Sequence, residues 1–189
     1  MDFQDIYNHI TMPERVFLLR NGEIKAMASY NRRFFAGVHS LIVEGVCLDP
    51  SVQGKGIFKE ITYQVVNGES VICLRTQNPR MYKSLADYCQ TTFPGLKTMP
   101  RQIRTIQEEF AAYLNCSIDK NGVVRGHYGE LFYGEEPEHS RISRFFKQDL
   151  EMDLHKGDAV LAIGINPNLG NFPKRDYEYS GCSEHPNCF

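Results

Sequence analysis

The sequence predicts an α/β (α+β) fold: a mixed, mostly antiparallel sheet flanked by helices. Three observations lead to this expectation. Strand-like apolar runs come first, and an Asn-Gly turn joins the first two. A strand, a glycine-rich turn, a helix and another strand follow in the middle of the chain, an order that makes a parallel pair by crossover. A last apolar strand, residues 158–165, comes after a long intervening region.

Length and composition favour one domain. The chain has 189 residues, of which 42% are apolar and 23% charged, ordinary values for a globular domain. We expect a single domain over residues 1–165 and a tail over 166–189, where Asn, Pro, Gly, Tyr and Ser are frequent. Lys plus Arg is 21 and Asp plus Glu is 23, a net charge of −2, which argues against a nucleic-acid-binding protein.

The first three strands are expected at residues 15–20, 23–30 and 40–48. The Asn-Gly pair between the first two is the strongest short hairpin signal, because both central residues of a type I′ turn need positive φ. The third run is rich in Leu, Ile and Val. Three consecutive antiparallel strands are therefore expected. Before them, residues 2–10 leave room for one short helix.

The middle of the chain continues with alternating elements. A helix is expected after the glycine-rich turn, up to about residue 67, because its apolar residues recur every four positions. A strand is expected at residues 70–75. Asn78 and Pro79 then open a second helix, since Asn caps helices well and Pro suits the first helical position.

The region 95–157 carries weaker signals, and we interpret it as an insertion before the last strand. It contains one stripe of apolar residues at helical spacing, a second Asn-Gly turn and a second helical pattern. The elements expected there are a helix over 102–114, a hairpin formed by 116–120 and 123–128, and a helix over 140–154.

The residues that suggest a chemistry lie where the third strand ends. Residues 53–58 read Gln-Gly-Lys-Gly-Ile-Phe and lead directly into a helix. Such a turn exposes backbone N–H groups at a helix N-terminus, where the helix dipole favours negative charge. Gly54 and Gly56 let the backbone approach a phosphate closely, and Lys55 adds a cation. The pattern is neither a P-loop nor Gly-x-Gly-x-x-Gly, and we interpret it as a pyrophosphate-binding turn.

This segment resembles the signature of the GNAT superfamily of N-acetyltransferases, which is Gln/Arg-x-x-Gly-x-Gly/Ala on the turn after the fourth strand. Gln53 and Gly56 match the signature, and the additional Gly54 is usual in the family. Phe58 departs from the final Gly or Ala. The resemblance therefore requires that its side chain point away from the cofactor while its backbone amide still donates.

The resemblance continues downstream and covers about residues 15–90. In the family a further strand is followed by a helix bearing an Asn and then a Tyr, and here Asn78 and Tyr82 follow the strand at 70–75. The implied fold is GNAT-like with two departures, a shortened N-terminus and the insertion at 95–157.

The resemblance implies an acetyl-CoA-dependent N-acetyltransferase that moves an acetyl group directly to a primary amine. Acetyl-CoA would be held at its pyrophosphate by the turn and along its pantetheine arm by backbone groups of the third strand. The acceptor, a small-molecule or protein amine, is not identified. The residues expected to bind the cofactor are Val46, Cys47, Leu48, Gln53, Gly54, Lys55, Gly56, Ile57, Phe58 and Asn78.

Glu44 is the residue that we expect to take the proton of the attacking amine. Strand alternation puts Glu44, Val46 and Leu48 on one face, unless a bulge at Gly45 changes the phase. A carboxylate beside the reacting amine can act as a general base. The alternative is an ion-paired surface glutamate, and His39 is a weaker rival for the base.

Tyr82 is the residue that we expect to protonate the departing CoA thiolate. It follows Asn78 by one helical turn, and a phenol can donate a proton to a thiolate. The alternatives are a tyrosine packed in the core and an Asn78 that is simply a helix cap. Cys47 lies near the expected thioester, but we interpret it as a core thiol, because direct transfer needs no covalent acyl-cysteine.

The tail contains Cys182, His185 and Cys188, which have the residue types of a zinc site but supply three ligands instead of four. A disulfide between the two cysteines and a free tail are the alternatives, and no metal is expected. The region 95–157 contains five arginines, which we expect on a solvated face. If that face borders the acceptor groove, the arginines would suit an acidic or phosphorylated acceptor.

The remaining expectations concern location, partners and rival functions. No apolar run reaches the ~20 residues that a membrane-spanning helix needs, and the N-terminus lacks a signal-peptide pattern, so a cytoplasmic protein with free thiols is expected. An incomplete N-terminal sheet leaves a homodimer open. The rival functions are a catalytically silent CoA-binding or regulatory module and an acyltransferase that uses a different acyl chain.

Overall fold

The computed structural model describes residue 7 and residues 11–167. The strands are β1 (Arg15–Asn21), β2 (Glu23–Phe35), β3 (Val38–Leu48), β4 (Val71–Thr76), β5 (Thr91–Phe93), β6 (Val123–Val124) and β7 (Ala159–Ile165). The helices are α2 (Ile57–Val65), α3 (Pro79–Tyr88), α4 (Arg101–Tyr113) and α5 (Ser140–Arg144), with a π-helical turn at Phe145–Asp149 and 3₁₀ turns at Pro50–Val52 and Leu154–Lys156.

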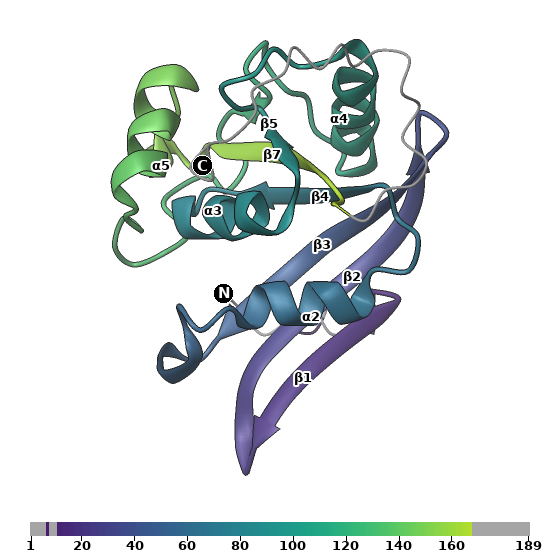
Figure 1. Ribbon diagram of the computed structural model, residues 1–189. Coiled ribbons are helices and arrows are strands. Elements are labelled where there is room, and N and C mark those ends of the chain that lie inside the picture. The colour runs from purple at the N-terminus through teal and green to yellow at the C-terminus, as the bar shows by residue number, and fades with distance from the viewer. Residues whose placement is uncertain (1–6, 8–10, 168–189) are drawn as a thin grey trace, which may run out of the picture.

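The strands form a single mixed sheet in the order β1-β2-β3-β4-β7-β5, and β6 also pairs with β7 (Figure 1). All neighbours are antiparallel except β3 and β4, which are parallel as the crossover through α2 predicts. The expected α/β fold with a mostly antiparallel sheet and flanking helices is therefore confirmed. So are the three consecutive antiparallel strands at the start.

Helices cover both faces of the sheet. On one face, α2, α3, α5 and the π-helical turn pack on a core that includes Phe58, Leu85 and Phe146. On the other face, α4 packs on a second core through Ile103, Ile106 and Phe110. We call these the α2 face and the α4 face. β7 lies between the two cores, and all seven of its residues are buried, which explains its continuous apolar sequence.

A buried ion pair fixes the C-terminal end of α2 to the sheet. Arg32 on β2 donates Nε to Glu69 and Nη2 to the carbonyl of Val65, the latter at 2.8 Å. Burial alone would raise the pKa of Glu69, but hydrogen bonds from the Asn67 backbone N–H and from Arg32 outweigh it and hold this pKa below its usual range. The helix therefore has one end tied to β2 through these contacts.

The insertion departs from the sequence expectation in two places. The predicted hairpin at 116–128 is wrong: β6 has two residues and pairs with β7, while 116–120 is irregular. The Asp119 carboxylate accepts the backbone N–H groups of Asn121 and Val123, at 2.8 and 3.0 Å, and closes a tight turn in place of a ladder. The predicted helix over 140–154 ends earlier, because α5 passes into the π-helical turn.

Most other boundaries lie within about two residues of the predictions, but β2 continues to Phe35, five residues beyond the predicted end, and β5 is a short strand that the sequence pattern missed. The segment from β5 to β7 joins two strands that are hydrogen-bonded neighbours. The expected helix at 2–10 and the Cys182–Cys188 segment lie outside the described residues, Tyr7 excepted. Within the described part of the chain, no helix is long and apolar enough to cross a membrane.

Candidate functional site

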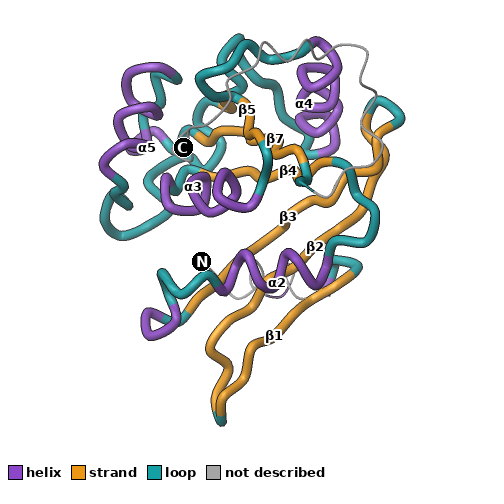
Figure 2. The backbone as a smooth tube through the Cα atoms, viewed as in Figure 1, coloured by secondary structure: helices purple, strands orange, loops and turns teal. Residues whose placement is uncertain are grey.

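β3 and β4 run side by side for four residue pairs and then diverge. The parallel pairing extends from Ser40 with Val71 to Val43 with Leu74. Beyond that point β3 continues beside β2, and β4 continues beside β7. Figure 2 shows the two strands separating toward α2 and α3. We call this divergence, between β3 after Val43 and β4 after Leu74, the fork.

A β-bulge at Glu44 coincides with the start of the fork. Ser29 pairs with Gly45 while Tyr30 pairs with Val43, so Glu44 is the extra residue of β3. The bulge shifts the alternation of β3 by one residue, so side chains after it point to the opposite face from the one that strict alternation predicts. Val46 packs against the core of the α2 face, whereas Glu44 bonds to Tyr113 of α4. The expectation that Glu44, Val46 and Leu48 share one face is therefore wrong, because the strand contains a bulge, at Glu44 instead of at Gly45.

The backbone of β3 offers polar groups to the fork at alternate residues. Asp49 donates its N–H to the carbonyl of Lys25 at 2.9 Å, so Asp49 belongs to a hydrogen-bonded pair with β2. Alternation then turns the N–H and C=O of Cys47 toward β2 and those of Val46 and Leu48 toward the fork. Two of the three residues expected to align the cofactor by their backbone have suitable geometry, and Cys47 does not.

Gln53 folds the glycine-rich turn back onto this strand. Its side-chain Nε2 donates to the carbonyl of Leu48 at 3.0 Å. That bond satisfies the outward carbonyl of Leu48 and fixes where the turn begins relative to β3. The first residue of the motif therefore has a structural contact that requires no bound phosphate.

Gly54 and Gly56 both adopt the left-handed conformation, with φ of 71° and 76°. Gly56 is the N-cap of α2, and no side chain caps this helix. The first N–H groups of a helix have no acceptor within it, so those of Ile57 and Phe58 point out of the helix start. The Phe58 side chain is buried in the core, 3% exposed, and so points away from the helix start, as the resemblance requires.

Cations flank the start of α2. Lys55 in the turn and Lys59 in the first helical turn are both exposed, and Glu60 is the acidic residue of that turn. Open space surrounds the turn, because a Cβ added at Gly54 or Gly56 would meet no atom within 4 Å. Backbone donors, a helix N-terminus and two lysines together make this segment suited to an anion.

On the α4 face of the fork, Glu44 is held by two hydrogen bonds. Asn31 donates Nδ2 and Tyr113 donates its hydroxyl, both to Oε1 at 2.8 Å. Arg33 stacks over the Tyr113 ring, 5.5 Å from its centroid. Burial, with the neighbouring Glu44, raises the pKa of Tyr113. Oε2 of Glu44 receives no hydrogen bond from any residue that the structure describes, so this half-buried carboxylate keeps one acceptor oxygen free.

A loop of the insertion covers the end of β4. Phe132 donates its backbone N–H to Oε1 of the buried Gln77 at 2.7 Å, and Tyr133 hydrogen-bonds to Asn78. Tyr128 lies over the guanidinium of Arg75, with 5.8 Å between Cζ and the ring centroid. Residues of the insertion thus form part of the fork's surroundings, although they lie far from the glycine-rich turn in sequence.

Tyr82 lies in the core, the position expected from the sequence as the alternative to its role as an acid. It is 1% exposed, packs against the rings of Phe145 and Phe146, and donates its hydroxyl to the carbonyl of Pro94. Burial raises the pKa of its phenol, which makes it a weaker acid. Asn78 is a true N-cap, since its Oδ1 accepts the N–H of Arg80 at 2.9 Å.

Two further expectations are corrected or weakened. Cys47 is exposed and not a core thiol, because it lies beyond the bulge on the part of β3 that α4 does not cover. Cys73 is buried as expected. His39 stacks on Phe34 with 4.9 Å between the ring centroids. It precedes Ser40, at the opposite end of the β3–β4 pairing from the fork.

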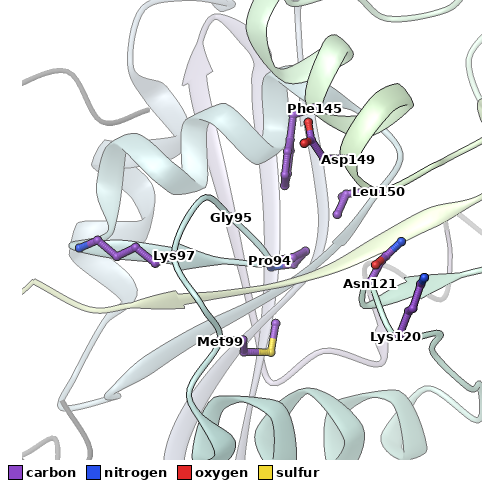
Figure 3. Close-up of a pocket in the computed structure, with 9 residues that line it drawn as sticks. All are labelled: Pro94, Gly95, Lys97, Met99, Lys120, Asn121, Phe145, Asp149 and Leu150. Carbon is purple, nitrogen blue, oxygen red and sulfur yellow. The ribbon is translucent and has the colours of Figure 1, made fainter. Parts of the chain in front are cut away.

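A cavity of about 230 Å³ lies elsewhere, between the loop after β5, the turn before β6 and the π-helical turn (Figure 3). The Lys97 side chain points away from the other lining residues in this view. None of the residues expected to bind the cofactor lines it. Among the described residues, no group of three or more His, Cys, Asp or Glu side chains could hold a metal ion.

The site contains residues that the motif does not reveal. Asn31, Tyr113 and Tyr133 come from other segments, and nothing in their local sequence marks them. Arg75 carries a recognisable signal, because it is a charged residue directly after the apolar run Val71–Leu74.

Comparison with known proteins adds no family. No protein-family model matches the sequence, and no curated protein matches it significantly.

Proposed function

We propose that this protein is an acetyl-CoA-dependent N-acetyltransferase of the GNAT type, moving an acetyl group directly to a primary amine. The observation that carries the proposal is the fork. β3 leaves β4 at a bulged glutamate, exposes backbone groups of Val46 and Leu48 to the gap, and ends in a glycine turn that opens α2. These are the groups that a reacting amine, a pantetheine amide and a pyrophosphate require, in the order in which the chain presents them.

The cofactor would be held mainly by backbone groups. The N–H groups at the start of α2 and the nearby lysines fit a pyrophosphate, and Gly54 and Gly56 leave the space it needs. The N–H and C=O of Val46 and the N–H of Leu48 fit the amides of the pantetheine arm, while the Leu48 carbonyl stays with Gln53. Acetyl-CoA would supply the acetyl group as an activated thioester.

Glu44 is suited to the proton transfer. The amine nitrogen forms a bond to the thioester carbonyl carbon, the C–S bond breaks, and the amine loses a proton to the carboxylate. Tyr113 and Asn31 fix the carboxylate through Oε1, which leaves Oε2 to accept the proton. CoA departs as the thiolate and takes a proton from solvent or from a nearby hydroxyl.

Tyr133 replaces Tyr82 as the candidate for that hydroxyl. Its contact with Asn78 places it at the first turn of α3, where β4 ends. Burial raises the pKa of Tyr133 and the hydrogen bond with Asn78 opposes that rise, so the phenol stays protonated at neutral pH and can donate.

The experiment that tests the function is a calorimetric titration with acetyl-CoA, with AMP as the control, followed by an amine screen. Micromolar binding of acetyl-CoA but not AMP, with transfer to an amine, is the expected result. Binding without transfer to any amine or from any acyl-CoA would instead identify a silent CoA-binding module. Transfer only from longer acyl-CoA molecules would identify a different acyltransferase, and failure to bind any of them would overturn the proposal.

A further inference from the structure

Arg75 is a half-buried arginine whose charge has no partner among the described residues. Its Nε is buried and makes no hydrogen bond, and no hydrogen bond or ion pair to its other nitrogens arises within the described part of the chain. The other half-buried arginines behave differently: Arg32 pairs with Glu69, and Arg104 pairs with Glu108. A guanidinium carries five donors, and leaving them unpaired in a partly buried place is costly.

The surroundings of Arg75 do not neutralise it. Tyr128 covers one face of the guanidinium, and His127 packs edge-on against Tyr128, with 4.7 Å between the ring centroids. Burial, and then the positive charge of Arg75, lower the pKa of His127 to about 4. His127 is therefore neutral at physiological pH. The site has a fixed positive charge and an aromatic wall, and no carboxylate of the described residues forms an ion pair with Arg75.

Arg75 and Glu44 are the residues at which the two strands of the fork begin to diverge. Val43 and Leu74 are the last paired residues of β3 and β4, so Glu44 and Arg75 are the next residue on each strand. Glu44 bonds to Tyr113 of α4. Residues of β4 alternate between the two cores, with Cys73 on the α4 face and Leu74 on the α2 face. Arg75 therefore shares the α4 face with Glu44, and because the strands have diverged, the two backbones are farther apart than the ~4.8 Å of paired strands.

We propose that Arg75 binds a carboxylate of the acceptor, so that the acceptor is a compact amine carrying a carboxylate close to its amino group, as an amino acid does. The inference rests on the proposed function for the role of Glu44, which would receive the amine proton. A planar guanidinium suits a carboxylate because it can donate two parallel hydrogen bonds. A base and an anion site on one face of the fork favour an acceptor that carries both groups over a protein lysine, whose amine has no neighbouring carboxylate.

Ligand binding tests this without requiring catalysis. We would titrate the protein with matched pairs that differ only in the carboxylate, namely N-acetyl-phenylalanine against N-acetyl-2-phenylethylamine, and the corresponding leucine and glutamate pairs. The phenyl pair comes first because Tyr128 and Phe132, whose ring centroids are 5.1 Å apart, offer an aromatic surface. We expect the carboxylate member of at least one pair to bind about tenfold more tightly or better.

The variants are Arg75→Gln, Arg75→Lys and, as the matched control, Arg101→Gln on the exposed start of α4. Arg75→Gln is expected to abolish the preference for the carboxylate, Arg75→Lys to keep part of it, and Arg101→Gln to keep all of it. Thermal unfolding of each variant checks folding. If Arg75 only supports Tyr128, Arg75→Gln will weaken both members of a pair equally, and the proposal fails.

Two other outcomes also decide the matter. Equal binding of both members, or binding of neither in every pair, overturns the inference. Aminophosphonate analogues separate a carboxylate site from a phosphate site, since a preference for the phosphonate would also overturn it. Acetyl-CoA is titrated separately, so the two proposals can fail independently. Carboxylate binding without acetyl-CoA binding would overturn the proposed function and support the anion site. Acetyl-CoA binding without a carboxylate preference would support the proposed function and overturn the anion site.

Discussion

The two sides of the fork are built in different ways. The side proposed for the cofactor uses backbone groups from one continuous stretch, from Val46 through the turn to Phe58. The side proposed for the acceptor uses side chains from separate segments: Asn31 on β2, Glu44 on β3, Arg75 on β4 and the end of α4. The first side can tolerate many changes of side chain but few of backbone conformation. The second side should instead be sensitive to changes of single side chains.

The largest effect is expected from Glu44→Gln. The amide keeps an oxygen for Tyr113 and Asn31 but cannot take a proton, so turnover should fall about 100-fold, the low end for a general base. Acetyl-CoA affinity should change less than twofold, because the cofactor side is untouched. Steady-state kinetics and calorimetry measure the two quantities. Glu108→Gln, at an exposed position of α4, is the control. Normal turnover of Glu44→Gln would exclude Glu44 from the mechanism.

The next effect is expected from Gly56→Ala. The methyl group would enter the open space at the start of α2, and acetyl-CoA affinity should fall about tenfold, which corresponds to ~1.4 kcal/mol. Gly37→Ala is the matched control, because Gly37 has a φ of 74° and equally free surroundings at the opposite end of β3. Both changes should lower the free energy of unfolding by roughly 1–2 kcal/mol through the same left-handed strain. Equal acetyl-CoA affinities for the two variants would contradict the assignment of the turn.

A smaller effect should separate two tyrosines. Tyr133→Phe should lower turnover several-fold if its hydroxyl helps the thiolate leave. Tyr82→Phe should leave turnover nearly unchanged and lower the free energy of unfolding by about 1 kcal/mol, because the carbonyl of the half-buried Pro94 loses its donor. Rates and chemical denaturation of both variants give the comparison. The reverse ranking of the rates would restore Tyr82 to the site.

The smallest change is a titration. NMR of the His127 ring should give a pKa of about 4, and Arg75→Gln should raise it by removing one of the two causes. The unfolded chain binds this proton at higher pH than the folded one, so the contribution of His127 to stability is lost as pH falls from about 6.5 toward 4. Arg101→Gln should leave the His127 pKa unchanged. If the Arg75→Gln protein has the same His127 pKa, the guanidinium of Arg75 does not lie close enough to His127 to affect its charge.

The contrast also explains what could be predicted from the sequence. The strand order of the first half, the crossover and the caps of α3 follow from local signals: an Asn-Gly pair, a periodic apolar stripe and an Asn-Pro start. The glycine turn belongs to this class, because its conformation and its donors are encoded in six consecutive residues. The sequence allows a bulge at Gly45, but whether a bulge forms, and that it falls at Glu44, depends on the register of β3 with β2.

The acceptor side could not be predicted in the same way. Tyr113 reaches Glu44 across 69 residues of sequence, and no local pattern marks either partner. Tyr82 satisfied the family spacing, yet its hydroxyl found Pro94 because the loop after β5 folds over α3. The apolar pattern around Cys47 predicts a buried strand, because the pattern cannot show that α4 stops short of this residue. Side-chain environment is set by packing between distant segments.

The place of β7 in the sheet has a consequence for biogenesis. It fills the position between β4 and β5, yet 82 residues of chain (77–158) separate it from β4. During synthesis the apolar edge of β4 therefore stays unpaired until the whole insertion has emerged, and contacts of such sequence separation form slowly. Nascent chains stopped before residue 159 should expose that edge and aggregate or recruit chaperones. The insertion thus delays the completion of the sheet.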